Sequence, residues 1–196
     1  PTGVDINGDG KTDVLYAGDL KGNLWKFEMT DPTTGFTSHA TPQVKRLFKA
    51  VSAAGDDQAI TVAPSVLRRP DGKYTVIFGT GRLLNINDKT KPPSGFPKQS
   101  LYGIVDDGVA AEITRTDLFA HRIVATYPTS GSTAGSRFIE PVPAQTGVKR
   151  GWRLDLDSTL AQDDGERVIS NSAILPGGAV VFSTSAPSTD ACTKEG

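Results

Sequence analysis

Residues 5–18 read Asp5-Ile6-Asn7-Gly8-Asp9-Gly10-Lys11-Thr12-Asp13-Val14-Leu15-Tyr16-Ala17-Gly18. Oxygen-bearing side chains fall at positions 1, 3, 5 and 9 of this stretch, and a glycine stands at position 6. This is the spacing with which an EF-hand-like loop wraps a hard cation. Gly8 and Gly10 permit the sharp, partly left-handed path that such a loop follows. The apolar residues that come next predict a strand, so the stretch predicts a metal loop that enters a β-hairpin.

The expected occupant of this loop is Ca²⁺, which takes about six to eight oxygen ligands. The expected ligands are side-chain oxygens at four positions, the last bound directly or through water, and one backbone carbonyl: Asp5, Asn7, Asp9 and Asp13, with the carbonyl of Lys11. Three carboxylates this close repel one another, so ion binding and local order are expected to be coupled. Tyr16 stands where an EF-hand has its bidentate Glu, so the loop must close at Asp13. An Asx-rich turn without an ion is the alternative.

Composition and charge exclude several classes of partner. The 196 residues carry 21 Lys and Arg against 22 Asp and Glu, a net charge of −1 that offers no steering field for nucleic acid. No apolar run approaches the length of a membrane-spanning helix, so membrane insertion is not expected.

Cys192 is the single cysteine and cannot form a bridge within the chain. Because the chain begins just before a metal loop, we expect a single fragment, residues 1–196, of something longer.

The abundance of Gly and Pro favours many short strands joined by turns. Strands are expected over residues 14–17, 24–29, 44–50, 59–67, 74–78, 100–105, 122–127, 151–156, 168–175 and 179–184. A turn-rich connection is expected over 31–43, and surface excursions over 85–99 and 128–149. Helical periodicity is nearly absent; the one candidate spans 115–125.

A repeat underlies these strands. The segment Val14-Leu15-Tyr16-Ala17-Gly18-Asp19 is echoed by Thr75-Val76-Ile77-Phe78-Gly79-Thr80 and more weakly by residues 179–184. Each copy of this segment is accompanied by a strand with an aromatic residue near its start. These aromatic residues are Trp25, Tyr102 and Trp152. Such recurring hairpins predict an all-β fold that is part of a β-propeller, with about three to four blades of antiparallel strands and long loops. A β-sandwich with long loops is the competing fold.

No set of residues predicts an enzyme. A Gly-x-Ser-x-Gly elbow is absent, and His39 and His121 have no partner at metal-ligand spacing. The run Gly79-Thr80-Gly81-Arg82 is better explained as a strand-end turn than as a phosphate cradle. The acidic pairs at 56–57, 106–107 and 163–164 are expected to be solvated turn residues. The three early aromatics could stack on a sugar, but packing in a β core explains their recurrence better.

The run from Asp5 to Phe27 resembles the calcium loop and adjoining blade of the PilY/PilC-type proteins, tip-associated adhesins of type IV pili. Further motifs agree in order: Phe78-Gly79-Thr80-Gly81-Arg82, Gln99-Ser100-Leu101-Tyr102-Gly103-Ile104, Arg167-Val168-Ile169-Ser170-Asn171 and Val180-Val181-Phe182. The resemblance implies a C-terminal β-propeller with Ca²⁺ in the loop as a regulator, located at the pilus tip or bacterial outer surface. The implied function is pilus extension and retraction, twitching motility and surface adhesion.

The partners implied by this resemblance are pilin or minor pilins and the remainder of the same chain, with a host or surface ligand as a further candidate. Arg-Gly-Asp is absent, so integrin binding has no support. Two alternatives stay open. One is a purely structural calcium in a β-domain, and the other is a propeller enzyme resembling the quinone-dependent dehydrogenases.

Overall fold

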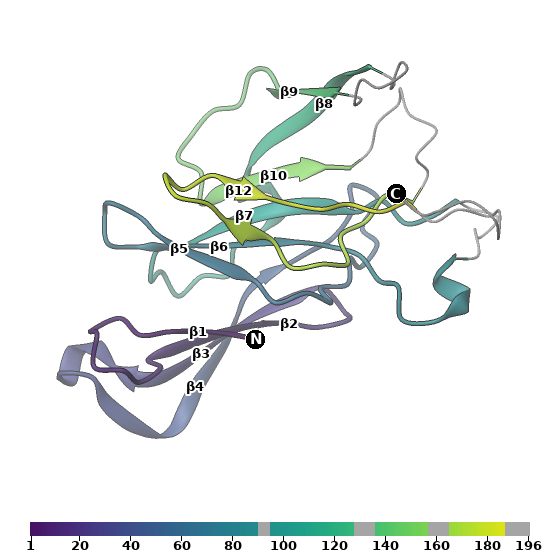
Figure 1. The fold of residues 1–196 in the computed structure, drawn as a ribbon. Coiled ribbons are helices and arrows are strands. Elements are labelled where there is room, and N and C mark those ends of the chain that lie inside the picture. Colours follow the sequence, from purple (N-terminus) through teal and green to yellow (C-terminus); the bar gives the residue numbers. More distant parts are fainter. Residues whose placement is uncertain (90–94, 128–135, 157–164, 187–196) are drawn as a thin grey trace.

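The computed structural model describes residues 1–89, 95–127, 136–156 and 165–186, in which strands dominate and the only helices are short 3₁₀ turns (Figure 1). The strands are β1 (Thr2–Val4), β2 (Val14–Gly18), β3 (Asn23–Asp31), β4 (Thr37–Lys49), β5 (Ser65–Arg68), β6 (Tyr74–Gly79), β7 (Ser100–Asp106), β8 (Phe119–Tyr127), β9 (Ser136–Pro141), β10 (Gly151–Asp155), β11 (Ala173–Ile174) and β12 (Val180–Val181). The 3₁₀ turns are η1 (Pro32–Thr34), η2 (Ile86–Lys89) and η3 (Arg115–Asp117). No helix in the described residues is long and apolar enough to span a membrane.

The strands form three sheets. The first has the order β1-β2-β3-β4, the second β5-β6-β7-β10-β8-β9, and the third consists of β11 and β12. All neighbours are antiparallel except β10 and β8, so the β8–β9 hairpin is added outside an ordinary four-stranded unit. Each sheet therefore contains or begins the four-stranded antiparallel unit of a propeller blade.

The first strands of the three sheets follow one another in space. β1 contacts β5, and β5 contacts β11. The Thr2 hydroxyl donates to the Pro64 carbonyl over 2.5 Å, and the Ser65 hydroxyl donates to the Ser172 carbonyl over 3.0 Å. Short inner strands arranged in succession, each continued outward by its own sheet, are the layout of a propeller. The prediction of an all-β propeller is confirmed, but the described residues contain two blades and the start of a third, fewer than the three to four expected.

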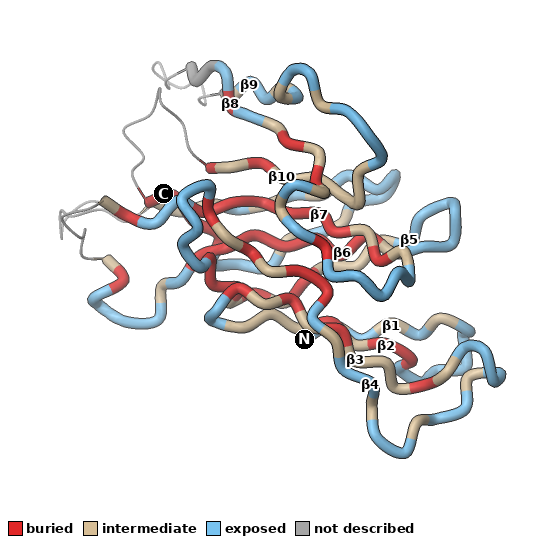
Figure 2. Tube along the Cα trace, turned by 180° about the vertical axis from the view of Figure 1, so that it is seen from behind, coloured by how far each residue is buried: buried red, intermediate tan, exposed pale blue. Residues whose placement is uncertain are grey.

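The main core lies between the first two blades. Phe48 from β4 meets Phe78 and Tyr102 from β6 and β7, with ring centroids 6.5 and 5.0 Å away. All three rings are fully buried. Figure 2 shows the buried positions concentrated along β6 and β7, the strands at the centre of the second blade. Burial of these aromatics supplies much of the stabilisation of the interface between the blades.

The sequence repeat has a steric cause. Gly18 ends β2 and Gly79 ends β6, and in each case a β-branched residue of the following linker occupies the space of a Cβ atom. A Cβ on Gly18 would lie 2.2 Å from Ile60 Cγ2, and one on Gly79 would lie 2.3 Å from Val168 Cγ2. The backbone contacts repeat too, because Ile60 donates to the Asp19 carbonyl and Val168 to the Thr80 carbonyl, each over 2.9 Å. The linker that follows each blade is thus packed tightly against the end of the second strand of that blade.

Several expected elements differ from those observed. The connection expected over 31–43 is wrong beyond residue 36, because Thr37–Lys49 forms one long strand paired with β3. The helix candidate over 115–125 is wrong as well. Only Arg115–Asp117 makes a 3₁₀ turn, and the rest belongs to β8, which pairs with β9 and β10. Pairing with neighbouring strands overrides weak local helical periodicity.

Other boundaries are shorter or displaced. The strand expected over 59–67 begins after Pro64, at Ser65, and those expected over 168–175 and 179–184 shrink to β11 and β12. The two expected surface excursions carry buried or ordered residues. Phe96 and Gln99 are buried, and Ser136–Pro141 forms β9. Residues 90–94 and 128–135 of these excursions lie outside the described residues.

Candidate functional site

The predicted metal loop, residues 5–13, connects β1 to β2. Pairing of Val4 with Val14 closes its base, and the Asp13 backbone N–H donates to the Val4 carbonyl over 2.9 Å. Gly8 and Gly10 adopt φ values of 81° and 86°, the left-handed region that favours glycine. No atom lies within 4 Å of the Cβ position at either glycine, so backbone conformation and not space requires glycine there.

The side chains of the loop bind its own backbone. Asp5 accepts from Gly8 N–H through Oδ1 and from Gly10 N–H through Oδ2, each over 2.7 Å. Asn7 Oδ1 accepts from Asp9 N–H, and Asp9 Oδ1 accepts from Lys11 N–H, both over 2.9 Å. These contacts curl the backbone around the Asp5 carboxylate and form short turns at Asn7 and Asp9.

Asp13 has a different environment. Its side chain is buried, with 1% relative exposure. Oδ2 accepts from Ile6 N–H and Oδ1 accepts from the Thr30 hydroxyl, each over 2.7 Å. Burial alone would raise the pKa of Asp13, but the hydrogen bonds from Thr30 and the backbone hold it below the ordinary value. Asp13 is therefore a charged anchor that joins the loop to β3.

The loop fits calcium in donor type and backbone path. All five predicted ligands offer hard oxygens, and each carboxylate oxygen that accepts one hydrogen bond retains capacity for another partner. Within the loop, whose residues the structure describes in full, the only ion pair is the exposed contact of Lys11 with Asp9 at 3.8 Å. The carboxylates do not converge, however: the described residues contain no group of three or more His, Cys, Asp or Glu placed to hold a metal ion. The assigned ligands therefore stay a prediction.

The strand that leaves the loop is tied to the second blade. Tyr16 on β2 and Lys26 on β3 face each other in register, and both reach Asp106 at the end of β7. Lys26 Nζ lies 2.8 Å from an oxygen of Asp106 and 2.8 Å from one of Glu28. Burial opposes ionisation of Asp106, but the Lys26 ammonium and the Tyr16 hydroxyl hold its pKa below the ordinary value.

The expectation that residues 106 and 107 are solvated turn acids is therefore wrong for Asp106, which is 8% exposed. Asp107 pairs with Arg150 at 2.7 Å. A signal for this cluster exists in the sequence, because Asp106 directly follows an apolar strand and Lys26 interrupts an alternating one. Neither signal identifies the residue with which Asp106 or Lys26 pairs. The acidic pair at 163–164 lies outside the described residues.

The aromatic residues of the repeat make packing contacts and hydrogen bonds within the fold. Tyr102 is fully buried, and its hydroxyl donates to Gln58 Oε1 over 2.5 Å. Trp25 donates from its indole nitrogen to Asp19 over 2.9 Å. Trp152 packs against a smaller core cluster that includes Leu101, Leu154 and Val168. The run Gly79–Arg82 is a strand-end connection, since Gly81 N–H donates to the Ala59 carbonyl over 2.8 Å. These contacts agree with the interpretation of packing over ligand stacking.

Comparisons with known proteins all point to the same family. The PilY1 beta-propeller domain family matches residues 1–119. A type IV pilus biogenesis factor PilY1 homolog of Xylella fastidiosa is 35% identical over 189 residues, which cover 94% of this chain and 12% of the relative. The type IV pilus biogenesis factor PilY1 of Pseudomonas aeruginosa is 32% identical over 225 residues, covering 98% of this chain and 19% of the relative.

A solved structure gives the same result. The crystal structure of the Pseudomonas aeruginosa PilY1 C-terminal domain matches with a TM-score of 0.75 and 29% identity, over 95% of this chain and 44% of that domain. The chain thus spans less than a fifth of the two relatives named above and under half of the solved domain.

Proposed function

The chain belongs to the PilY1 β-propeller domain family, and on that premise we propose that it acts in type IV pilus biogenesis as a calcium-binding propeller segment. Ca²⁺ binds in the loop of residues 5–13, through Asp5, Asn7, Asp9 and Asp13 and the carbonyl of Lys11. The ion regulates pilus extension and retraction, and through them twitching motility and surface adhesion.

One observation carries this proposal. The loop carries hard oxygen donors on a backbone path that has two left-handed glycines, and its last acid is anchored to β3. Without an ion, the carboxylates of Asp5 and Asp9 add repulsion to the loop, and binding of Ca²⁺ removes it. Occupancy of the loop is then coupled to the order of the β1–β2 connection.

The proposed location is the pilus tip or the bacterial outer surface, and the proposed partners are pilin or minor pilins, with a host or surface ligand in addition. The rest of the parent chain would complete the propeller beyond β11 and β12. A pilus-associated location follows from the family, whose named members are pilus biogenesis factors.

Complementation tests the regulatory role. A strain lacking its own PilY1 would receive the full-length parent gene as wild type, as Asp9→Ala or as Asp71→Ala, an exposed turn acid that serves as the control. The proposal expects Asp9→Ala to change pilus number and twitching-zone diameter at millimolar calcium while Asp71→Ala behaves as wild type. A lower melting temperature with unchanged pili would show that the calcium is structural only.

The role is non-enzymatic by this account, as the names of its relatives as pilus biogenesis factors suggest. The alternative of a quinone-dependent dehydrogenase makes a separate prediction. Pyrroloquinoline quinone added with Ca²⁺ would bind and give an absorbance change that follows the protein concentration. Our proposal expects no saturable binding of the quinone.

A further inference from the structure

Asn7 and Gly8 form the only Asn-Gly pair in the sequence. Both residues are exposed, in the loop between β1 and β2. The side-chain amide of an asparagine is lost when the backbone nitrogen of the next residue attacks the amide carbon and closes an imide ring. A following glycine favours this attack, because it has no side chain that obstructs the ring. This pair is therefore the place in the chain where the reaction meets the least steric hindrance.

The loop holds the carbonyl of the Asn7 side-chain amide by a hydrogen bond. Asp9 N–H donates to Asn7 Oδ1 over 2.9 Å. The bond joins a side chain to the backbone two residues on, as in an Asx turn, so it folds the amide of Asn7 back over the peptide that follows. The same donor stabilises the negative charge that develops on this oxygen when a nucleophile adds to the amide carbon. The amide is thus both placed and polarised for attack by Gly8.

The attacking nitrogen has an acceptor for its proton. Gly8 N–H donates to Asp5 Oδ1 over 2.7 Å, and the second oxygen of Asp5 accepts from Gly10 N–H over the same distance. A backbone nitrogen is a weak nucleophile until its proton is removed, and a carboxylate within hydrogen-bond reach can take that proton. The bond from Gly10 keeps the carboxylate in position. Asp5 is therefore placed as a base for Gly8.

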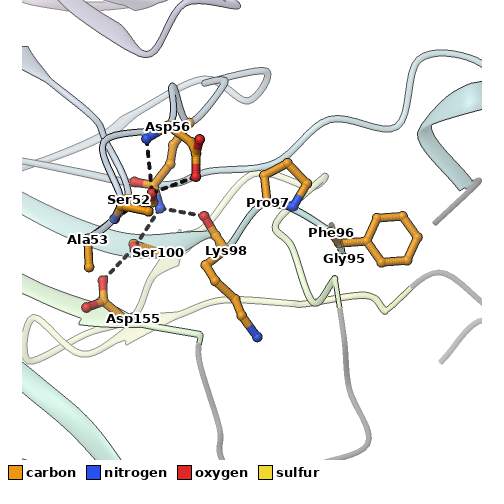
Figure 3. A pocket seen from close by; sticks show the side chains of 11 residues that line it. Ser52, Ala53, Asp56, Gly95, Phe96, Pro97, Lys98, Ser100 and Asp155 are labelled. Atoms are coloured by element: carbon orange, nitrogen blue, oxygen red, sulfur yellow. Dashed lines mark hydrogen bonds between the residues drawn. The ribbon is translucent and has the colours of Figure 1, made fainter. Parts of the chain in front are cut away.

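Two other side-chain amides lack parts of this arrangement. Asn85 Oδ1 accepts from Asn87 N–H over 2.9 Å in the same kind of turn, but the next residue is Ile86, whose branched side chain hinders attack. Figure 3 shows the cavity, of about 420 Å³, that Gln58 lines. Gln58 is fully buried, and its amide donates to a backbone carbonyl and accepts from the Tyr102 hydroxyl. Its hydrogen bonds hold the fold together and leave the amide inaccessible to water.

We propose that Asn7 is a deamidation site and that the loop itself promotes the reaction. The bond between Gly8 N and Asn7 Cγ forms as the Gly8 proton passes to Asp5 Oδ1. The bond between Asn7 Cγ and its amide nitrogen then breaks, and the amide leaves with that proton as ammonia. Water opens the imide at either of its two carbonyl carbons. The product at position 7 is aspartate or isoaspartate, in which the backbone is longer by one methylene group.

The modification changes the chemistry of the loop. Aspartate at position 7 adds a carboxylate beside those of Asp5 and Asp9. Deamidation does not depend on calcium, but its effect on calcium rests on the function proposed above, in which Asn7 is a ligand. The aspartate product should bind Ca²⁺ more tightly, because the charge of the ligands tunes the affinity of such loops.

Peptide mass spectrometry after incubation of the 196-residue chain at neutral pH in EGTA measures the reaction. Replacement of the amide by an acid raises the mass of the peptide that carries it. We expect Asn7 to be converted faster than Asn85 in the same sample. Conversion of Asn7 that is no faster than that of Asn85 would overturn the proposal.

Two matched variants test the role of the loop. Asp5→Asn keeps the shape of the side chain but weakens the base, so it should slow the conversion of Asn7 by about tenfold or more. Asp31→Asn is the same change at a turn acid that accepts from Thr33 N–H, and it should leave the rate unchanged. Melting curves check the folding of both variants.

The wild-type chain in urea makes the comparison without any substitution. Unfolding removes the contacts of Asp5 and Asp9 with the reacting groups, so Asn7 should be converted more slowly in urea than in the folded chain. An unchanged or higher rate in Asp5→Asn, or a higher rate in urea, would show that the loop protects the amide and would overturn the proposal.

Isothermal titration of Asn7→Asp with Ca²⁺ tests the effect on calcium separately. The variant should bind Ca²⁺ severalfold more tightly than wild type, and equal affinities would contradict this effect. Absence of Ca²⁺ binding in both chains would refute the proposed function, whereas the deamidation rates would stand as measured.

Discussion

The Tyr16 hydroxyl donates to Asp106 Oδ2 over 2.6 Å in a buried contact that joins the first blade to the second. Tyr16 lies three positions after Asp13, the last residue of the metal loop, and Asp106 closes the central strand of the next blade. Lys26 completes the cluster from the strand paired with Tyr16. The strand that leaves the loop is thus fixed to the adjoining blade by a charged hydrogen-bond network.

Removal of the Tyr16 hydroxyl should weaken this junction. Tyr16→Phe leaves the ring in place and takes one hydrogen bond from a buried carboxylate, so we expect a loss of about 1.5–3 kcal/mol in the free energy of unfolding. Tyr74→Phe is the matched control, because the Tyr74 hydroxyl makes no hydrogen bond within the part of the chain that the structure describes. Urea denaturation measures both variants. Equal effects of the two substitutions would contradict a special role for Tyr16.

The Asp106 carboxylate should make the junction sensitive to acid. Its pKa in the folded protein lies below the ordinary value of 3.8, so its stabilisation is fully present above that value. The stabilisation is lost as the pH falls through the lower folded-state pKa. Asp106→Asn should therefore be less stable than wild type at pH 7, and the difference should shrink as the pH approaches 3. Melting temperatures across this range provide the measurement, and a constant difference would argue against the assignment.

The contact of Gly18 with Ile60 should show as non-additive energetics. Gly18→Ala forces a Cβ into the space of the Ile60 side chain, and we expect a loss of about 1–3 kcal/mol from overpacking. Ile60→Ala should cost about 2–5 kcal/mol through the cavity it leaves. In the double variant the new methyl group enters that cavity, so the combined loss should be smaller than the sum. Additive losses in denaturant titrations would contradict the tight contact between Gly18 and Ile60.

Asp13 should matter even without calcium. Asp13→Ala leaves the Ile6 N–H and the Thr30 hydroxyl without their acceptor, so we expect a loss of about 1–3 kcal/mol in buffer that contains EGTA. Asp9→Ala should cost little in the same buffer, because Asp9 is exposed. Thermal melts of the two variants with EGTA make the comparison. A large loss from Asp9→Ala alone would reverse the roles that we assign to these acids.

The sequence predicts the strand-rich fold and its repeat because both depend on local patterns. The glycines at 18 and 79 are visible in the sequence, but their reason is a contact with Ile60 and Val168, which lie far along the chain. The same limit applies to Asp106, whose partners come from another blade. The failed helix over 115–125 is of this kind too, since the pairing of β8 with β10 brings together segments that local periodicity does not relate.

The metal loop is the opposite case, because its predicted ligands lie within nine consecutive residues and all can be named from the sequence. The loop geometry confirms the left-handed glycines at 8 and 10. The burial of Asp13 and its bond to Thr30 could not be predicted, since Thr30 belongs to the end of the next strand but one. Long-range contacts therefore decide which acid anchors the loop.

Isothermal titration with Ca²⁺ after treatment with EGTA tests the central proposal most directly. We predict one binding event per chain for the wild type and for the control Asp71→Ala, and loss of the binding heat for Asp9→Ala. A wild-type chain that gives no heat with Ca²⁺, or an Asp9→Ala variant that binds as tightly as wild type, would contradict the calcium loop.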